Sequence, residues 1–491
     1  MTMTISVKSM RNKAALLCAG FLAPLYLQAQ TAATSQAGTM PLTNLSAFKN
    51  PSKTWQIAGD VSADLGKDNN LSTAKGTGVL VNLPDKKNHG EDLYTTAEHG
   101  DAELELDYMM AKGSNSGIYL QGRYELQLLD SWNVKNPKAG DNGGIYERWD
   151  ESKPEGQKGY GGLAPRQNAS RAPGLWQHLK VSFQAPKFDG SGKKIQNARM
   201  VRVELNGVTI HENVELLGPT RGAMSNDEKA TGPLRIQGDH GAVAFRNISI
   251  TSPVAAPPQQ ATTRNNNNPV DPILVEAPVN TMLRSFMDLP GQPRIRVVHA
   301  ISVGSPEKVH YTYDLDKGTM IQVWRGNFLD ATPMWHSRGD GSSRPAGAVQ
   351  RFGTPMFALA KLASPQAPWV ADSAGTSYRP KGYTLDENDQ PTFQYRMYGA
   401  TVSDAIRAID NGQGFHRELT VQNPAGGELY ARLAEGATIE EKSNGMYLVD
   451  GKSYYLRLDD AKGTKPVVRE ANGRKELIAP VRGKLGYSIL F

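Results

Sequence analysis

The stretch "MVRVELNGVTIHENV", residues 200–214, contains two runs of alternating apolar and polar residues on either side of Asn206-Gly207. Alternation with a period of two is typical of a β-strand that buries one face. An Asn-Gly pair between two such runs predicts a tight hairpin, because both turn residues must adopt positive φ. The stretch therefore predicts two antiparallel strands joined at residues 206–207.

The same alternation recurs across the first half of the chain. Three further stretches show it: "DAELELDYMM" (101–110), "HLKVSF" (178–183) and "VAFRNISI" (243–250). The side chains expected to face inward are Ala102, Leu104, Leu106, Tyr108, Leu179, Val181 and Phe183. Long stretches with helical periodicity are absent. This half is therefore predicted to be all-β, an antiparallel β-sandwich of the jelly-roll type.

One change in composition divides the chain of 491 residues into domains. Residues 253–278 are rich in Pro, Gln and Thr and contain four consecutive Asn, a composition that buries little apolar surface and predicts a linker. Two globular domains are expected on either side, at 41–252 and 279–491. Alternating stretches in the second domain predict another β-rich, sandwich-type unit, with "VSDAIRAI" (402–409) as its one short helix.

The N-terminus has the pattern of a secretory signal peptide. Basic residues up to Lys13 precede an apolar run, and Ala29 marks a cleavage position, so residues 1–29 are expected to be removed and the protein to be periplasmic or secreted. No other segment approaches the roughly 18 apolar residues of a membrane span. Cys18 is the only cysteine, so the mature chain is expected to lack disulfides, thiolate nucleophiles and Cys-ligated metals.

The charge of the chain gives no reason to expect a nucleic-acid partner. The formal net charge is +6, of which the signal peptide contributes +3, leaving about +3 on the mature chain. The His residues form no HExxH motif and no EF-hand pattern occurs, so neither a metal nor a cofactor is predicted.

The stretch "NSGIYLQGRYELQLLDSW", residues 115–132, predicts two strands with a turn between them. Its apolar residues alternate with a polar set that shares the opposite face: Tyr119, Gln121, Arg123, Glu125 and Gln127. Such a face is usually solvated. The same mixture of aromatic and polar side chains suits a sugar, so two interpretations stay open from the residues alone.

Five segments occur in an order that resembles the bacterial secreted family called the 3-keto-disaccharide hydrolase domain. They are "SNSGIYLQGRYELQLLDSW", "GGIYERW", "PGLWQHLKVSF", "VRVELNGVTIHENVEL" and "GPLRIQGDHGAVAFRNISI", and the match as a whole extends over about residues 55–250. The resemblance implies a concanavalin-like sandwich that acts on glycosides oxidised at C3. It also implies a partner reaction, that of a sugar oxidoreductase, which supplies the oxidised saccharide.

A ketone at C3 acidifies the proton on C2, so a base can remove it and the resulting enolate can expel the C1 substituent. Glu125 is the candidate base, and Arg123, two residues away on the same face, is the candidate for stabilising the enolate. An ion pair between the two is the structural alternative. Asp130 is a further candidate at the strand end, where it could equally cap the following turn.

The "QGDHG" cluster supplies the remaining polar candidates. Gly238 and Gly241 bracket Asp239 and His240, and His240 is the candidate acid for the leaving group because histidine titrates near neutrality. Gln237 and Asp239 are expected to bind substrate, although structural hydrogen bonds would explain the pair as well.

Two aromatic or acidic residues outside that cluster complete the predicted site. Trp176 could stack on a sugar ring or fill the core, and Glu147 lies in a glycine-rich loop as a weaker candidate. Three functions are consistent with these features: an enzyme acting on 3-keto-glycosides, a non-catalytic carbohydrate-binding protein of the cell envelope, and a structural envelope protein.

The second domain resembles a segment of multidomain secreted bacterial proteins through "VWRGNFLDATPMWHSRGDG", residues 323–341. Some of those proteins carry c-type haem, but this chain has no CxxCH motif. The residues from 327 onward are expected to form a loop whose Trp and Arg side chains either bind sugar or plug the end of a sandwich.

Overall fold

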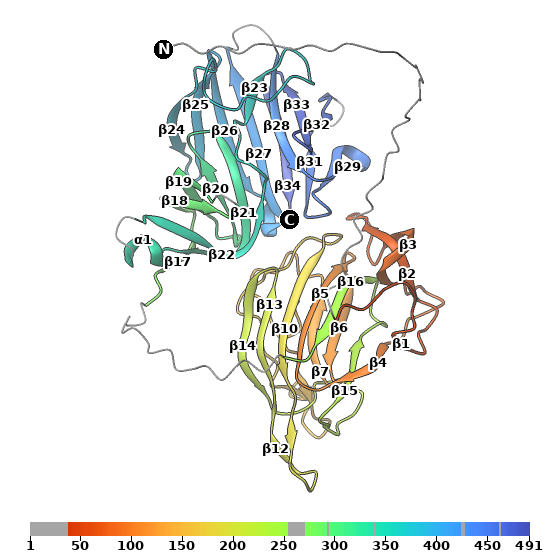
Figure 1. Cartoon of the computed structure of the whole chain (residues 1–491). Coiled ribbons are helices and arrows are strands. Elements are labelled where there is room, and N and C mark those ends of the chain that lie inside the picture. Colours follow the sequence, from red (N-terminus) through yellow and green to blue (C-terminus); the bar gives the residue numbers. More distant parts are fainter. Residues whose placement is uncertain (1–37, 254–270, 292–293, 337–339, 424–427, 461–462) are drawn as a thin grey trace, which may run out of the picture. The chain divides into compact units, whose positions relative to one another are not determined.

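The computed structural model describes residues 38–253, 271–291, 294–336, 340–423, 428–460 and 463–491. The predicted signal peptide and most of the predicted linker lie outside these residues, so the proposed domain boundaries stay predictions. Strands β1–β16 lie within residues 48–251 and strands β17–β34 within 274–490 (Figure 1). Among the described residues, no helix is long and apolar enough to cross a membrane.

The first half contains two large antiparallel sheets (Figure 1). The five-stranded sheet has the order β1 (Phe48–Lys49), β4 (Leu93–His99), β15 (Gly232–Ile236), β6 (Asn115–Leu120) and β7 (Tyr124–Leu129). The seven-stranded sheet has the order β14 (Val208–Leu216), β13 (Ala198–Leu205), β10 (Gln177–Gln184), β5 (Ala102–Met110), β16 (Val243–Thr251), β3 (Leu71–Asn82) and β2 (Trp55–Ala63). Two short pairs accompany them: β8 (Arg148–Trp149) with β9 (Gly159–Tyr160), and β11 (Lys187–Phe188) with β12 (Lys194–Gln196).

The two sheets enclose a core made by the alternating apolar residues. Leu104 and Leu106 of β5 meet Leu126 and Leu128 of β7 in one fully buried cluster. The inward residues predicted for β5 and β10 are all buried, which confirms the predicted β-sandwich. The hairpin predicted at residues 206–207 is also confirmed, because Leu205 pairs with Val208 across a turn in which both Asn-Gly residues have positive φ.

The second half contains three further sheets (Figure 1). A six-stranded sheet contains β17 (Leu274–Val275), β21 (Thr319–Asp330), β20 (Val309–Asp314), β19 (Ile295–Gly304), β18 (Thr281–Leu289) and β22 (Ser342–Arg351). A four-stranded sheet contains β23 (Leu359–Lys361), β28 (Leu429–Gly436), β33 (Arg474–Val481) and β32 (Val467–Ala471). An eight-stranded sheet contains β24 (Arg379–Leu385), β25 (Pro391–Met397), β26 (Ala400–Ala408), β27 (Gly414–Gln422), β34 (Lys484–Leu490), β31 (Tyr454–Leu458), β30 (Met446–Val449) and β29 (Ile439–Glu441).

Two expectations for this half are wrong. Residues 402–408 belong to β26 rather than to a helix, because Val402, Asp404 and Ile406 are buried at every second position. The expected loop after residue 326 instead continues β21 as far as Asp330, and the helix α1 (Thr332–His336) follows it.

Candidate functional site

The hairpin of β6 and β7 sets the register of the candidate site. Gln121 and Gly122 both have positive φ, of 53° and 67°, and make a two-residue turn that the sequence analysis did not assign to a turn type. The turn places Tyr119 directly opposite Glu125 and Gly117 directly opposite Gln127. A β-carbon on residue 117 would lie 2.3 Å from Glu125 Oε1, so only glycine leaves room for this carboxylate.

The polar face of this hairpin is buried rather than solvated. The apolar side chains of both strands point into the sandwich core, while Tyr119, Glu125 and Gln127 occupy the opposite face. Glu125 is nevertheless only 2% exposed. A carboxylate loses much of its hydration at such a position, so its chemistry depends on the few polar groups around it.

Five side chains form a row across neighbouring strands of the five-stranded sheet. Tyr94 of β4 pairs in register with Arg235 of β15, Arg235 with Tyr119 of β6, and Tyr119 with Glu125 of β7. Tyr146 is the fifth member and extends the row beyond β7, because its backbone N–H donates to the Glu125 carbonyl at 3.2 Å. We call these five residues the cross-strand row.

Arg235 is the cation nearest the centre of the cross-strand row. Its guanidinium lies 4.2 Å from the centre of the Tyr119 ring and is paired with Asp92, which directly precedes β4. It also donates to the Gly222 carbonyl. This arginine was not among the predicted site residues.

The segment 220–224 passes over the cross-strand row. The Thr220 hydroxyl accepts a hydrogen bond from the Glu125 backbone N–H at 3.0 Å. Residue 222 is a glycine with a φ of 77°, and a β-carbon there would lie 3.2 Å from the Tyr119 hydroxyl. The segment therefore helps to shield Glu125 from water.

Burial raises the pKa of Glu125 to about 8. The hydrogen bond with Tyr119 and the charge of Arg235 oppose this effect, whereas the charges of Asp92 and Asp239 add to it. Burial and the neighbouring Glu125 raise the pKa of Tyr119, so its hydroxyl stays protonated at neutral pH. The pair therefore offers one carboxyl group that titrates near neutrality and one fixed hydrogen-bond donor.

Three polar atoms around the cross-strand row lack a hydrogen-bond partner among the described residues. They are Glu125 Oε2, Arg235 Nε and Gln237 Oε1. Buried polar atoms are nearly always paired, so three unpaired atoms around one row of side chains indicate a place for a polar ligand. Gln237 joins this group because its backbone N–H donates to the Gly117 carbonyl.

Two predicted site residues hold the hairpin turn instead of contacting Glu125. Arg123 donates to the carbonyls of Asp227 at 2.6 Å and of Gln121 at 2.8 Å. The Gln121 amide donates to the carbonyl of Ala230 at 2.8 Å. Arg123 therefore makes backbone contacts, and the predicted ion pair between Arg123 and Glu125 is not formed.

The predicted residues further along β7 also make local contacts. The Gln127 amide donates to Asn115 Oδ1 and to the Ser116 carbonyl. Asp130 accepts from the backbone N–H of Gly113 at 2.9 Å and of Trp132 at 3.4 Å. Asp130 is thus a turn cap, the structural alternative that the sequence left open, and burial raises its pKa.

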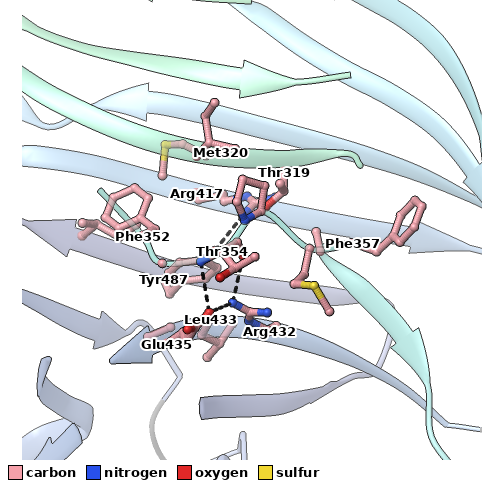
Figure 2. A pocket seen from close by; sticks show the side chains of 17 residues that line it. Thr319, Met320, Phe352, Thr354, Phe357, Arg417, Arg432, Leu433, Glu435 and Tyr487 are labelled. Carbon is pink, nitrogen blue, oxygen red and sulfur yellow. Dashed lines mark hydrogen bonds and ion pairs between the residues drawn. The ribbon is translucent and has the colours of Figure 1, made fainter. Parts of the chain in front are cut away.

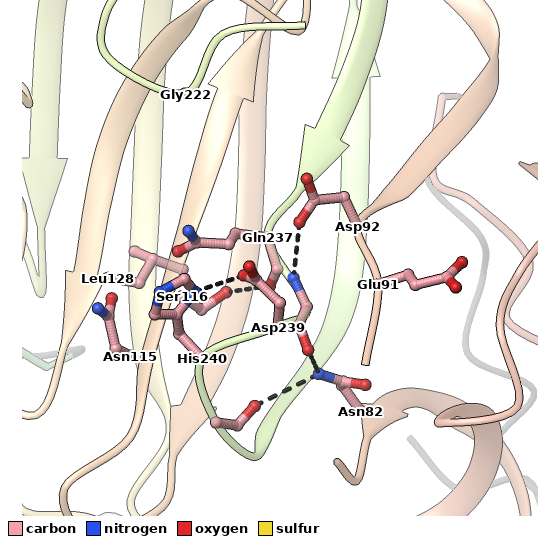
Figure 3. A network of polar contacts seen from close by, with 12 residues as sticks. Asn82, Glu91, Asp92, Asn115, Ser116, Leu128, Gly222, Gln237, Asp239 and His240 are labelled. Atoms are coloured by element: carbon pink, nitrogen blue, oxygen red, sulfur yellow. Dashed lines mark hydrogen bonds and ion pairs between the residues drawn. The ribbon is translucent and has the colours of Figure 1, made fainter. Parts of the chain in front are cut away.

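The "QGDHG" cluster lies on the loop between β15 and β16 (Figure 3). Asp239 accepts from His240 Nδ1 at 2.5 Å, and both side chains are about half exposed. Asn82 donates to the Gly238 carbonyl, and the Gly238 N–H donates to Asp92. Because Asp92 directly precedes β4, the second bond ties the loop to the start of that strand. Asp239 lies near enough to influence Glu125 electrostatically.

Trp176 does not share the face of Glu125. It directly precedes β10 of the seven-stranded sheet, where it is buried in a small apolar cluster and covered by the guanidinium of Arg246 at 4.1 Å. His178 follows on the same strand and pairs with Asp107 at 2.9 Å. The proposed stacking of Trp176 on a sugar in this site is therefore a wrong expectation.

Four residues in or next to the cross-strand row were missed by sequence reasoning: Tyr94, Arg235, Asp92 and Tyr146. A signal existed for Arg235, because it stands two positions before Gln237 and so shares its face in an alternating strand. The other three depend on strand order, which local sequence does not specify. Among the described residues, no group of three or more His, Cys, Asp or Glu side chains is arranged to hold a metal ion.

The second half holds a separate pocket between residues 352–358 and strands β27, β28 and β34 (Figure 2). Arg417 lies in it, paired at 2.6 Å with the fully buried Asp404 and donating to the Tyr487 hydroxyl at 3.0 Å. Arg432 is paired with Glu435. These opposite charges neutralise one another, so the pocket offers a ligand no net charge from these groups.

Comparison with known families assigns the first half of the chain to the carbohydrate-active proteins. Residues 43–251 match the family model described as the 3-keto-alpha-glucoside-1,2-lyase-like domain. The match confirms, for this segment, the family resemblance predicted from the sequence, and it supports glycoside hydrolase-type activity.

Solved structures give three further comparisons. Two proteins of Parabacteroides distasonis ATCC 8503, both provisionally described as glycosyl hydrolases, are 23% and 20% identical, each over 44% of this chain and over 84% and 98% of their own chains, with TM-scores of 0.29. The carbohydrate-binding module CBM66 from Bacillus subtilis is 9% identical over 41% of this chain and 98% of its own, with a TM-score of 0.19. No curated protein matches the chain.

Proposed function

We propose that residues 43–251 form an enzyme domain that cleaves glycosides carrying a ketone at C3, with Glu125 as the base. The observation that carries the proposal is the unpaired Oε2 of Glu125, a buried carboxylate whose pKa is raised to about 8. A base works best when its pKa lies near the operating pH and its acceptor atom is free. The family match supports the substrate class.

The reaction begins when the Glu125 carboxylate takes the proton from C2 of the sugar. The electron pair of the C2–H bond forms an enolate, whose negative charge rests on the C3 oxygen. The enolate then collapses to a C1=C2 double bond and breaks the C1–O bond to the leaving group. Water then adds to C1, its hydroxide forming the new C1–O bond and its proton returning to the acid that protonated the leaving group, while Glu125 returns its proton to C2, so the net reaction is hydrolysis.

Arg235 replaces Arg123 as the group that stabilises the enolate oxygen in this proposal. Among the described residues its Nε–H has no partner, and one strand, β6 with Tyr119, separates it from Glu125 in the sheet. A preorganised cation beside the developing oxyanion lowers the barrier without reorganising when the charge appears. His240, half exposed and paired with Asp239, is assigned to protonate the leaving oxygen.

We also propose that the protein acts outside the cytoplasm, on a sugar that another enzyme has already oxidised. The N-terminal signal pattern directs the protein to the periplasm or the medium. The substrate requires an earlier oxidation of the C3 hydroxyl to a ketone, so a sugar oxidoreductase is the kind of enzyme that must act before this one.

The test is incubation of the purified full chain with 3-keto-trehalose, followed by mass spectrometry of the released glucose. The wild-type protein should release glucose, and Glu125→Gln should release at least a thousandfold less while keeping its melting temperature. Tight sugar binding with no release by the wild type would favour the carbohydrate-binding alternative. Full activity of Glu125→Gln would remove Glu125 from the mechanism.

A further inference from the structure

The edge of the five-stranded sheet next to Glu125 extends into a second group of polar and aromatic side chains. Residue 145 bridges to Leu126 of β7, and the chain then continues into the short hairpin of β8 and β9. Glu147 and Trp149 come from this hairpin, and Arg221 comes from the segment that passes over the cross-strand row. We call Glu147, Trp149 and Arg221 the edge cluster.

Arg221 connects the members of the edge cluster. Its guanidinium lies 3.6 Å from the centre of the Trp149 ring and 3.3 Å from Glu147 Oε1, while its backbone N–H donates to the Glu147 carbonyl at 2.8 Å. The Trp149 indole N–H donates to Glu151 at 2.7 Å. These contacts fix the indole ring, the guanidinium and the carboxylate relative to one another.

Tyr146 links the edge cluster to the base. It is the last member of the cross-strand row beyond Glu125, where its backbone N–H donates to the Glu125 carbonyl at 3.2 Å, and its hydroxyl forms a hydrogen bond with Arg221. Neighbouring strands lie about 4.8 Å apart, so the row from Tyr94 to Tyr146 covers about 19 Å. That length exceeds one sugar ring, and Glu125 lies near one end of it.

The composition of the edge cluster indicates a neutral polyhydroxylated ligand. Arg221 and Glu147 neutralise each other, which leaves a donor and an acceptor for hydroxyl groups but no net charge. An indole ring supplies the flat surface on which the C–H face of a sugar packs. Unlike Glu125, the Arg221 side chain is 46% exposed, so a ligand can reach it from solvent.

We infer that the edge cluster binds the leaving sugar of a 3-keto-disaccharide, on the far side of the bond that breaks. The inference rests on the proposed function, because Glu125 defines where that bond lies. The oxidised ring then occupies the row from Glu125 toward Tyr94, and the second ring lies over Trp149. The edge cluster sets the preference for disaccharides over glycosides with small leaving groups.

The hairpin provides a matched control for this inference. Tyr160 pairs with Arg148, one residue away from Trp149, and so points to the opposite face of the hairpin, where Lys153 lies 3.7 Å from its ring. Tyr160→Ala removes an aromatic ring of similar size without touching the edge cluster. A general loosening of the hairpin would affect both variants equally.

The experiment compares 3-keto-trehalose with methyl 3-keto-α-glucoside, using the full chain. Trp149→Ala should lower kcat/KM for the disaccharide at least tenfold and change that for the methyl glycoside less than twofold. Tyr160→Ala should change neither by more than twofold. An equal loss on both substrates, or an equal loss in Tyr160→Ala, would overturn the assignment.

A binding measurement separates this inference from the proposed chemistry. If the wild type turns over neither substrate, the proposed function fails. Calorimetry with 3-keto-trehalose then tests, without catalysis, whether the edge cluster binds a sugar. Binding that weakens at least tenfold in Trp149→Ala and is kept in Tyr160→Ala would uphold the subsite. No binding by the wild type, or equal binding by all variants, would refute it.

Discussion

The carboxylate of Glu125 and the hydroxyl of Tyr119 lie directly opposite each other on adjacent strands, and a hydrogen bond joins them. Tyr119 donates its hydroxyl proton to the Glu125 carboxylate, which is almost fully shielded from water. The Oε2 atom of Glu125 has no hydrogen-bond partner among the described residues, so it can accept a proton from a substrate. Because burial outweighs this donor, the pKa of Glu125 is raised to about 8. Glu125 is therefore largely protonated at neutral pH.

The first prediction concerns the pH dependence of the rate. Only the ionised carboxylate can accept the C2 proton, so the rate at which 3-keto-trehalose loses its C2 proton on the enzyme should rise about tenfold per pH unit below pH 8 and level off above it. Initial rates measured between pH 5 and 9.5 check this. A plateau that is already complete at pH 6 would contradict the assignment of Glu125 as the base.

The second prediction concerns the pH dependence of stability. The folded state raises the pKa of Glu125 from 4.5 to about 8, so between these values the native protein binds a proton that the unfolded chain has lost. This contribution to stability is complete below pH 4.5 and is lost as the pH rises toward 8. Glu125→Gln should therefore gain stability relative to the wild type between pH 5 and pH 8.5, as measured by urea denaturation. A difference independent of pH would refute it.

The third prediction concerns Gly117. Its replacement by alanine places a methyl group 2.3 Å from Glu125 Oε1, so the carboxylate must move and activity should fall at least a hundredfold. Gly190→Ala is the control, because a β-carbon there meets no atom within 4 Å. Steady-state kinetics and circular dichroism separate displacement of the base from unfolding. Unchanged kinetics in Gly117→Ala would show that the position of this carboxylate is not critical.

The fourth prediction concerns Arg235. Lysine keeps the charge but cannot reach Asp92, the Gly222 carbonyl and a substrate oxygen at once, so Arg235→Lys should lower kcat by about 10²–10³-fold. The matched control is Arg246→Lys on the seven-stranded sheet, where the arginine pairs with Asp107. Equal kinetics for the two variants would exclude Arg235 from the reaction.

The fifth prediction concerns the buried pair of Arg417 and Asp404 in the second half. Their side chains are 3% and 0% exposed, so Arg417→Met leaves an uncompensated buried carboxylate and should cost about 3–5 kcal/mol. Arg482→Met, which breaks the exposed pair with Glu428, should cost less than about 1 kcal/mol. Guanidinium denaturation of the two variants compares these costs. Similar values would mean that the buried pair contributes little.

Local sequence was sufficient where a signal repeats within one strand or one turn. The Asn206-Gly207 turn and the inward residues of β5 follow from rules that act over a few residues. The helix expected at 402–409 is instead a strand in which Asp404 occupies a buried position, because Arg417 on the next strand pairs with it in the core. Because the buried residue Asp404 is charged, the alternation of apolar residues along β26 is interrupted in the sequence.

The candidate site was predictable only in part for a related reason. Glu125 and Tyr119 share one hairpin, so their common face could be predicted from spacing. Arg235 joins them because β15 inserts between β4 and β6, a pairing between segments more than a hundred residues apart. Arg123 was misassigned because its contact with the carbonyl of Asp227 depends on the path of a long loop.

The cross-strand row also limits how this domain can change over evolution. Each member comes from a different segment, and a shift of one residue in any contributing strand would turn its side chain to the opposite face of the sheet. Insertions and deletions within β4, β6, β7 or β15 should therefore be selected against, whereas length changes in the tip of the β8–β9 hairpin leave the register intact. Diversification of sugar preference is thus expected to proceed through that hairpin while the reaction itself is preserved.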